Sequence, residues 1–263
     1  MDYEQFTEEV WAHYCQHMRS MPWRDDPSLY NVLVSELMLQ QTQVPRVLTK
    51  FAEFMSVFPT IESLASASLA DVLIVWQGLG YNRRAKYLHE AAKYIVANGQ
   101  PTDIEGLVKL PGVGKNTAGA IMAYVYNQPV AYIETNIRTV YFHHFYPNDA
   151  NVSDARLLEL VAATVDKEHP REWYWALMDY GAFLKSQGMG RLDVSKHYKK
   201  QSALKGSVRE VRGQILRALV SGDMTLADLK ATLDADGRFT PAFDGLLADG
   251  LIEHNDGQVH LTK

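Results

Sequence analysis

The sequence predicts a mainly α-helical protein that ends in a small α+β module. Before residue 187, apolar residues recur at helical spacing over residues 6–19, 29–39, 45–58, 69–75, 83–97, 117–125, 137–146, 155–165 and 173–183. Prolines and glycines separate these segments, and no strand-like alternation occurs before Leu251. We therefore expect a core made of helices, with Ser153 and Thr102 as the N-caps of two of them.

Residues 207–263 carry a different pattern. Three amphipathic segments, 208–220, 226–233 and 241–249, precede two short alternating segments that flank Asn255-Asp256-Gly257. An Asp-Gly pair in this setting is a strong hairpin signal. Three helices and a hairpin follow the order of a winged-helix domain, which either binds DNA or packs against a neighbouring domain. The polar, basic segment 187–206 is interpreted as a linker, so the helical domain is expected over 1–186.

The composition is that of a globular protein without a membrane span. Hydrophobic residues make up 47% of the chain, which is enough for a well-filled core. The longest apolar runs, such as 72–76 and 118–125, are far too short to cross a bilayer. The N-terminal segment is acidic and aromatic, unlike a secretory signal. We therefore expect a cytoplasmic protein with no membrane partner.

The formal net charge of −5 excludes a protein that coats nucleic acid through its overall charge. A DNA-binding role therefore needs a local basic patch. The segment 191–217 is a candidate, and its basic residues are Arg191, Lys196, His197, Lys199, Lys200, Lys205, Arg209, Arg212 and Arg217. The alternative is an ordinary solvated face.

The segment 110–119, LPGVGKNTAG, has the pattern of a phosphate-binding turn between two helices. Gly112 and Gly114 can adopt positive φ and let the backbone approach a phosphate. The exposed N–H groups of the next helix favour an anion. We expect DNA contacts from Gly112, Val113, Gly114, Lys115 and Thr117. Two glycines alone also fit any tight corner between helices.

The complete string resembles the LPGVGxxTA hairpin of the helix-hairpin-helix DNA glycosylases. Four further strings resemble the MutY-type adenine glycosylases in the right order: MPWR at 21–24, SELMLQQTQV at 35–44, GLGY at 78–81 and MDYGA at 178–182. The resemblance covers roughly residues 6–186. It implies a two-lobed helical fold, and it implies a partner that is double-stranded DNA containing a mispaired or damaged base.

Such an enzyme breaks the N-glycosidic bond of a base that is flipped out of the duplex. As in glycoside hydrolysis, an acid protonates the leaving group and a carboxylate stabilises the oxocarbenium-like transition state. Glu36 falls on the family's catalytic glutamate and is the expected acid, which burial would keep protonated near neutral pH. The alternative is a structural carboxylate that caps a helix or pairs with an arginine.

The second carboxylate departs from the family pattern. MutY-type enzymes carry DGN(V/I), and this chain has Glu134-Thr135-Asn136-Ile137. Glu134 keeps the charge but adds a methylene, and a misplacement of about 1 Å can cost on the order of a hundredfold in rate. We expect Glu134 to stabilise the cation or position a water, with altered chemistry and a structural role as alternatives. Asn136 resembles the family's asparagine that contacts the sugar or the carboxylate.

Asn116 occupies the position where bifunctional relatives such as endonuclease III carry a lysine that forms a Schiff base. Lys115 is one residue earlier, on a different helical face. The resemblance therefore implies a monofunctional hydrolase with little lyase activity. Adenine glycosylases usually have serine or tyrosine here, so Asn116 is a second departure.

The resemblance also implies residues that extrude and hold the base. Gln41 and Tyr81 match residues that the family inserts into the DNA stack, and a core aromatic is the alternative for Tyr81. Further DNA contacts are expected from Gln40, Thr42, Lys196, Lys199 and Lys200. The expected base pocket comprises Arg19, Met21, Trp23, Arg24, Asn116 and Asp179, with packing or salt bridging as the alternative.

Two parts that most relatives have are missing from the sequence. Cys15 is the only cysteine, so no four-cysteine iron–sulfur cluster can form. Residues 207–263 are too short for the MutT-like domain that recognises 8-oxoguanine. We expect a monomer without a cofactor, except that an alkali cation at the hairpin carbonyls is compatible with the resemblance. Adenine is the first expectation for the excised base. Uracil or thymine opposite guanine, hypoxanthine, an alkylated base, and a non-catalytic lesion-binding protein are alternatives.

Overall fold

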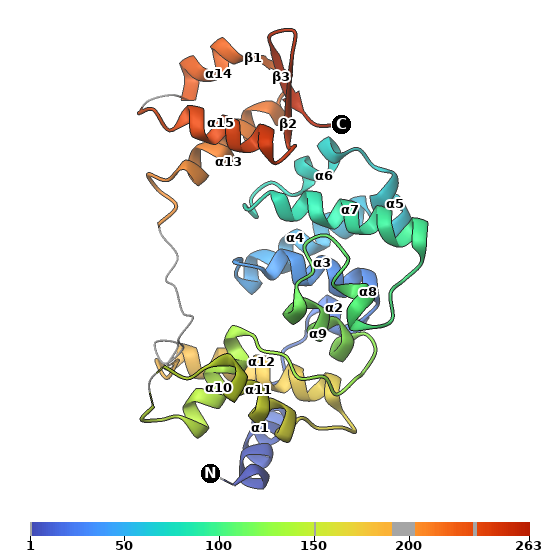
Figure 1. Ribbon diagram of the computed structural model, residues 1–263, viewed down its shortest axis with the longest axis vertical. Coiled ribbons are helices and arrows are strands. Elements are labelled where there is room, and N and C mark those ends of the chain that lie inside the picture. The colour runs from blue at the N-terminus through green and yellow to red at the C-terminus, as the bar shows by residue number, and fades with distance from the viewer. Residues whose placement is uncertain (1, 150, 191–202, 234–235) are drawn as a thin grey trace. The chain divides into compact units, whose positions relative to one another are not determined.

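Figure 1 shows the computed structural model, which describes residues 2–149, 151–190, 203–233 and 236–263. They form two compact units. Among these residues, the first unit comprises 2–33, 101–109, 113–149 and 151–190, and the second comprises 34–100, 110–112, 203–233 and 236–263. Most of the expected linker lies outside the described residues, so the domain boundaries 1–186 and 207–263 stay predictions.

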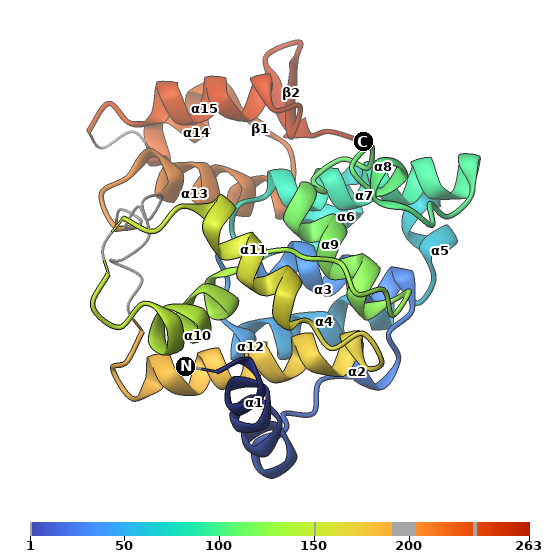
Figure 2. The same cartoon turned by 60° about the horizontal axis from the view of Figure 1, so that its bottom comes forward.

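The first unit is built around one long, largely buried helix. Its helices are α1 (Tyr3–His17), α2 (Pro22–Asp25), the start of α3 (Leu29–Leu39), α8 (Ile104–Leu107), α9 (Lys115–Tyr124), α10 (Thr135–Phe145), α11 (Asp154–Thr164) and α12 (Pro170–Ser186). Figure 2 shows α12 beside α10 and α1, which it contacts extensively. Trp173, Tyr174 and Leu177 of α12 are fully buried there. The ring of Phe6 meets those of Tyr141 and Trp173 edge-on or tilted, which is a favourable aromatic geometry.

Two glycines let chain segments of the first unit approach closely. A Cβ at Gly181 of α12 would lie 2.3 Å from the backbone oxygen of Asn136. A Cβ at Gly119 of α9 would lie 2.5 Å from the Cβ of Tyr132. Neither distance is possible between real atoms, so both positions need glycine. The first of these contacts sets how near α12 comes to the start of α10, where Glu134 and Asn136 lie.

The second unit contains the rest of α3 with α4 (Val44–Val57), α5 (Ile61–Ser66), α6 (Leu69–Val75) and α7 (Arg83–Asn98). Helix α7 packs against α5 and α6. It buries Leu88, Ala92 and Ile95 on one face, as its apolar spacing predicts. No helix of the described residues is both long and apolar enough to cross a membrane.

The C-terminal module of this unit has the predicted order of three helices and a hairpin. Its elements are α13 (Val208–Val220), β1 (Met224–Thr225), α14 (Leu226–Leu233), α15 (Phe239–Ala248), β2 (Ile252–Asn255) and β3 (Gln258–Leu261). The strands form an antiparallel sheet in the order β1-β3-β2. Asp256 and Gly257 link β2 to β3 with φ angles of 52° and 77°. Positive φ at both positions is the signature of a type I′ hairpin turn, so the Asp-Gly signal is confirmed.

The mainly helical prediction is confirmed, and the differences concern short elements. Helices α2, α5 and α8 and strand β1 are absent from the sequence-based expectation. Each is shorter than the window over which periodicity can be recognised. The Ser153 cap is confirmed, because its side chain accepts from the Arg156 N–H. The Thr102 prediction is wrong: Asp103 caps α8 and accepts from the Gly106 N–H at 2.7 Å.

Replacing Gly181 by alanine tests the close approach of α12 and α10. The added methyl group collides with backbone, so we expect a loss of about 1–3 kcal/mol in the free energy of unfolding. The measurement is urea unfolding followed by circular dichroism. Gly213→Ala in α13 is the control, because a Cβ there meets no atom within 4 Å. Alanine in an open helical position should stabilise by about 0.5–1 kcal/mol. Equal stability of the wild type and Gly181→Ala would contradict the geometry.

Candidate active site

The hairpin of residues 110–117 uses its two glycines differently. Gly112 has φ +78°, and a Cβ there would lie 2.8 Å from the Cβ of Tyr87 and 3.0 Å from Cδ2 of Leu37. Gly114 has φ −86°, so the expectation of positive φ is wrong for this residue. Gly114 is instead the N-cap residue of α9, without a side-chain cap, and a Cβ there would meet nothing within 4 Å. Its exposed position leaves the start of α9 open to an anion.

The side chains around this turn divide into buried and exposed ones. Val113 is buried and anchors the turn, and Thr117 is half-buried. Lys115 and Asn116 are exposed in the first turn of α9. Lys115 thus adds a positive charge where a helix start already favours a phosphate. The placement of Asn116 in a base pocket stays a prediction.

Glu36 is the only charged residue of α3, as the sequence shows. It is half-buried, and its neighbours Val34, Ser35, Leu37 and Met38 are buried. Nearly the whole helix lies in the apolar interior. Burying an ionisable side chain costs stability unless it is paired or hydrogen-bonded, and carboxyl groups kept in such surroundings are often functional.

Glu134 is the N-cap residue of α10, and its side chain makes no capping hydrogen bond. It follows two buried residues, Tyr132 and Ile133. Burial raises the pKa of Glu134 to about 7. Near neutral pH, the side chain of Glu134 is therefore protonated in part of the molecules and negatively charged in the rest. A group with such a pKa is suited to a role in a reaction in which charge develops.

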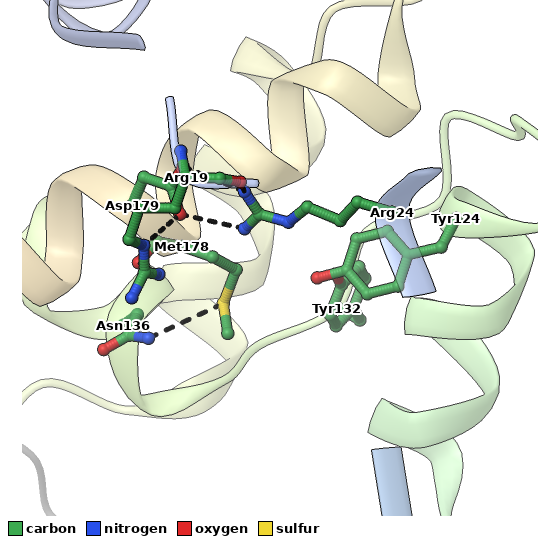
Figure 3. A network of polar contacts seen from close by, with 7 residues as sticks. All are labelled: Arg19, Arg24, Tyr124, Tyr132, Asn136, Met178 and Asp179. Carbon is green, nitrogen blue, oxygen red and sulfur yellow. Dashed lines mark hydrogen bonds and ion pairs between the residues drawn. The ribbon is translucent and has the colours of Figure 1, made fainter. Parts of the chain in front are cut away.

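Asn136 lies two residues further on, in the first turn of α10 (Figure 3). Its Nδ2 faces the sulfur of Met178 at 3.9 Å, which is a weak contact. Its Oδ1 is buried and accepts no hydrogen bond from the described residues. A buried amide oxygen without a donor costs about 1–3 kcal/mol, and such atoms are rare enough to need an explanation. A ligand hydroxyl or N–H would supply the missing donor.

Two arginines surround the carboxylate of Asp179 on α12 (Figure 3). Oδ1 accepts from Arg19 Nε at 2.7 Å and from Arg24 Nη2 at 2.9 Å. Oδ2 accepts from the Arg19 backbone N–H at 3.0 Å and from Arg24 Nη1 at 2.9 Å. Burial alone would raise the pKa of Asp179, but the hydrogen bonds and charges of Arg24 and Arg19 outweigh it and hold that pKa below its usual range.

These bonds give Asp179 the salt-bridged setting that the sequence left open as an alternative. A direct bond from Asp179 to a base would replace one of them, so base contact stays a prediction. The side chain of Arg24 also lies over the ring of Trp175, 5.5 Å from its centroid. The expected pocket residues Met21 and Trp23 are buried, and they lie between Arg19 and Arg24 in the sequence.

Gln41 and Tyr81, the residues expected to enter the DNA stack, share an unusual backbone. Their φ angles are 61° and 47°, in the left-handed region that glycine favours. Gln40 Nε2 donates to the Gly112 carbonyl at 3.4 Å, and the Thr42 hydroxyl donates to the Leu79 carbonyl at 3.4 Å. The segment that carries Gln41 is thereby joined to both glycine turns of the second unit.

Tyr81 is half-exposed, so the alternative of a core aromatic does not fit. The Arg84 and Arg209 guanidinium groups lie 5.5 and 5.1 Å from its ring centroid, and Arg209 also donates to its hydroxyl. Arg209 comes from α13 of the C-terminal module. Lys86 of α7 donates to the Asp249 carbonyl of the same module at 2.8 Å. The module thus contacts α7 and Tyr81, and its binding to DNA stays a prediction.

Sequence reasoning missed Arg84, which is buried in α7. Its guanidinium binds carbonyls in the two segments that lead up to Gln41 and Tyr81. The signal was present in the sequence: Arg84 lies on the same helical face as Leu88, Ala91 and Ile95. A charged residue on an apolar helix face has to be paired or hydrogen-bonded.

No site for an iron–sulfur cluster or another metal is apparent in the described part of the chain. The four-cysteine cluster of the family does not fit, because Cys15 is the only cysteine and lies exposed in α1. Among the residues that the structure describes, no three His, Cys, Asp or Glu side chains gather around a possible metal position. Lys196, Lys199 and Lys200, which were expected to bind DNA, lie outside the described residues.

Comparison with known proteins agrees with the motifs. Residues 34–163 match the family described as HhH-GPD superfamily base excision DNA repair protein. The adenine DNA glycosylase of Mycobacterium tuberculosis (strain ATCC 25618 / H37Rv) is 35% identical over 277 residues, covering 95% of this chain and 91% of the relative. That of Mycolicibacterium smegmatis is 33% identical over 280 residues, covering 97% and 95%.

Solved structures share the fold. A thermostable thymine-DNA glycosylase aligns with a TM-score of 0.61 and 22% identity, over 68% of this chain and 86% of its own. A trapped endonuclease III–DNA covalent intermediate aligns with a TM-score of 0.54 and 17% identity, over 79% and 93%. At these identities the likeness concerns the fold alone.

Replacing Asp179 by asparagine tests the arginine cluster. Arg19 and Arg24 would lose a buried counter-charge, so we expect a loss of about 3–5 kcal/mol in the free energy of unfolding at pH 7. Because folding lowers the pKa of Asp179, its contribution is present above about pH 4 and is lost as the pH falls further. Urea unfolding between pH 3 and 7 should show the difference between the two proteins shrinking at low pH.

Asp154→Asn is the matched control for this experiment. Asp154 is paired with Arg138, but its side chain is 41% exposed. Loss of a pair that is screened by solvent should cost at most about 1 kcal/mol. An equal effect of the two substitutions would show that burial does not strengthen the Asp179 cluster.

Proposed function

Because the chain belongs to the HhH-GPD superfamily of base excision DNA repair proteins, as a MutY-type DNA glycosylase, we propose that it hydrolyses the N-glycosidic bond of adenine in a mispaired or damaged duplex. The observation that carries the proposal is the identity to adenine DNA glycosylases over nearly the full length of both chains. The departures at Asn116 and Glu134 keep uracil, thymine, hypoxanthine and alkylated bases in the test.

In the proposed reaction, Glu36 donates a proton to a ring nitrogen of the extruded base. The C1′–N bond then breaks, its electron pair leaves with the base, and positive charge develops on the sugar. Water adds to C1′ and releases a proton, so the products are the free base and an abasic site. The setting of Glu36 on an otherwise buried helix supports this role.

Glu134 and Asn136 would act on the sugar side. A carboxylate at Glu134 opposes the positive charge that develops at C1′. Asn136 Oδ1, which lacks a donor among the described residues, would accept a hydrogen bond from the substrate or from the attacking water. Asn116 has no nucleophilic amine, so we propose that the enzyme forms no Schiff base and has little lyase activity.

The DNA would be held mainly by its backbone. Backbone N–H groups at Gly112, at Gly114 and at the uncapped start of α9 would bind phosphate, and Lys115 would add charge. With a net charge of −5, binding depends on such local contacts. We further propose a monomer that works in the cytoplasm in association with the nucleoid. It would need no iron–sulfur cluster, and an alkali cation at the hairpin carbonyls is its only cofactor candidate.

The proposal is tested with end-labelled duplexes under single-turnover conditions. The panel holds adenine opposite 8-oxoguanine or guanine, and also uracil, thymine, hypoxanthine and alkylated bases. We expect abasic product from an adenine duplex, with strand cleavage only after alkali. Glu36→Gln should lower the rate by about 100-fold to 10,000-fold, which is the usual contribution of a general acid.

Glu159→Gln, an exposed residue of α11, is the control and should retain wild-type activity. Strand cleavage without alkali would contradict the monofunctional mechanism. Product from another base alone would reassign the substrate. Binding without product from any duplex would support the non-catalytic alternative.

The pH dependence tests Glu134. Its pKa of about 7 means that the negatively charged form is gained as the pH rises through neutrality. We expect the single-turnover rate of the wild type to rise with a midpoint near 7, and Glu134→Gln to lack this rise. Glu134→Asp, which restores the residue usual in the family, should keep a pH-dependent activity.

The raised pKa of Glu134 also makes the free energy of unfolding depend on pH. A carboxyl group whose pKa is raised by folding stabilises the protein at low pH, and that contribution is lost as the pH rises through 7. Relative to the wild type, Glu134→Gln should therefore gain stability between pH 5 and 8. A constant difference over this interval would refute the assigned burial of Glu134.

A further inference from the structure

Arg84 is 5% exposed, and its guanidinium group binds two separate chain segments. Nη1 donates to the carbonyls of Leu37 and Met38, both at 2.8 Å, and to that of Gln40. Nη2 donates to the carbonyls of Leu79 at 3.1 Å and Gly80 at 3.0 Å. Its further bonds go to the Thr42 hydroxyl at 3.1 Å and to the Tyr81 carbonyl at 3.4 Å. No acidic side chain takes part in these bonds.

The first segment is the end of α3. The last carbonyls of any helix lack partners within the helix, and a glycine in the left-handed conformation commonly follows to satisfy them. Here α3 ends at Leu39, and Gln41 stands in the left-handed position with φ 61°. Arg84 bonds the Leu37, Met38 and Gln40 carbonyls directly. The helix end is thus satisfied by a side chain from α7.

The second segment, 79–81, also ends with a non-glycine residue in the left-handed conformation. Tyr81 has φ 47°, and the Leu79, Gly80 and Tyr81 carbonyls around it accept from Arg84. A residue with a Cβ adopts this conformation only where its surroundings enforce it. Two such residues therefore flank one buried guanidinium group. They are also the two residues expected to enter the DNA stack.

We propose that Arg84 is a positioning residue for base extrusion, which holds the 40–42 and 79–81 segments so that Gln41 and Tyr81 are pre-organised to replace the extruded nucleotide in the stack. This inference rests on the proposed function, and it adds a residue that touches neither the base nor the sugar. Pre-organisation matters because ordering two loops at the moment of extrusion would oppose it.

The shape and charge of the arginine side chain explain why Arg84 can hold both segments. A planar guanidinium has donors pointing in several fixed directions, and a lysine ammonium cannot reach both segments in this way. Burial lowers the pKa of Arg84 to about 10, so it keeps its charge at neutral pH. That charge lies over Trp76 and Tyr81, 5.5 Å from each ring centroid. Tyr81 is therefore held by Arg84 through its ring as well as through its backbone.

The test compares Arg84→Met and Arg84→Lys with Arg171→Met in the whole 263-residue chain. Arg171 is the matched control, because it also donates to carbonyls at a helix end, those of Tyr124, the last residue of α9, and of Val125. Two duplexes are used for each protein: one with adenine opposite 8-oxoguanine, and one with the same adenine opposite an abasic site. Extrusion costs least when the base has no partner.

We expect Arg84→Met to lose about tenfold or more in single-turnover rate on the paired duplex and less than about threefold on the unpaired one. Arg84→Lys should show the same preference, and Arg171→Met should show none. Each protein is assayed at the same interval below its own Tm, so that lost stability does not count as lost activity. An equal loss on both duplexes would overturn the inference and leave Arg84 a purely structural residue.

A second readout does not depend on bond cleavage. 2-Aminopurine placed beside the target base fluoresces more strongly when its neighbour leaves the stack. The wild type should raise this fluorescence on binding, and the Arg84 variants should raise it less. If the wild type gives the rise but no abasic product, the proposed function fails and the inference stands. No rise with the wild type, or the same rise with the Arg84 variants, would overturn the inference.

Discussion

In each unit, arginine guanidinium groups bind polar groups from chain segments that are far apart in the sequence. A helical core leaves carbonyls and N–H groups without partners wherever a helix ends, and burying them unpaired is costly. In the second unit, Arg84 supplies donors to the end of α3 and to the turn before α7. In the first unit, Arg24 and Arg19 enclose the Asp179 carboxylate and join the start of the chain to α12. Glu36 precedes the first carbonyl that Arg84 binds, and Asn136 contacts Met178, the neighbour of Asp179.

The close packing of α12 on α10 has a direct consequence for the candidate site. Gly181 brings α12 against the backbone of Asn136, and Glu134 and Asn136 are half-buried there. Burial is also what raises the pKa of Glu134. The glutamate here reaches one methylene further from the backbone than the aspartate usual in the family, and its raised pKa leaves it only partly ionised at neutral pH. Asn136 Oδ1 beside it accepts no hydrogen bond from the residues that the structure describes, which leaves it free for the proposed substrate contact.

The long helices could be predicted from the sequence, because each repeats its apolar residues over several turns. Helices of four to six residues, such as α2 and α5, give no measurable period. Strand β1 has two residues and forms only by pairing with β3. The capping error at Thr102 has a simple origin, since Asp103 is an equally good cap and one residue decides where α8 begins.

The candidate site was predicted from motifs more completely than from physical reasoning. The strings around Gly112 and Tyr81 identified segments with positive φ, and the string around Glu36 identified the one charged residue of α3. Arg84 was overlooked because an arginine among apolar residues interrupts a periodic pattern and was given no role. Which carbonyls it binds depends on segments far apart in the chain, and no local pattern contains that information.

The central claim is that this protein releases an intact base, and mass spectrometry of the small-molecule products tests it most directly. The account predicts that a duplex with adenine opposite 8-oxoguanine yields free adenine in the same molar amount as abasic strand, and that Glu36→Gln yields neither. Recovery of the duplex with every base attached, from wild-type protein that binds it, would contradict the account.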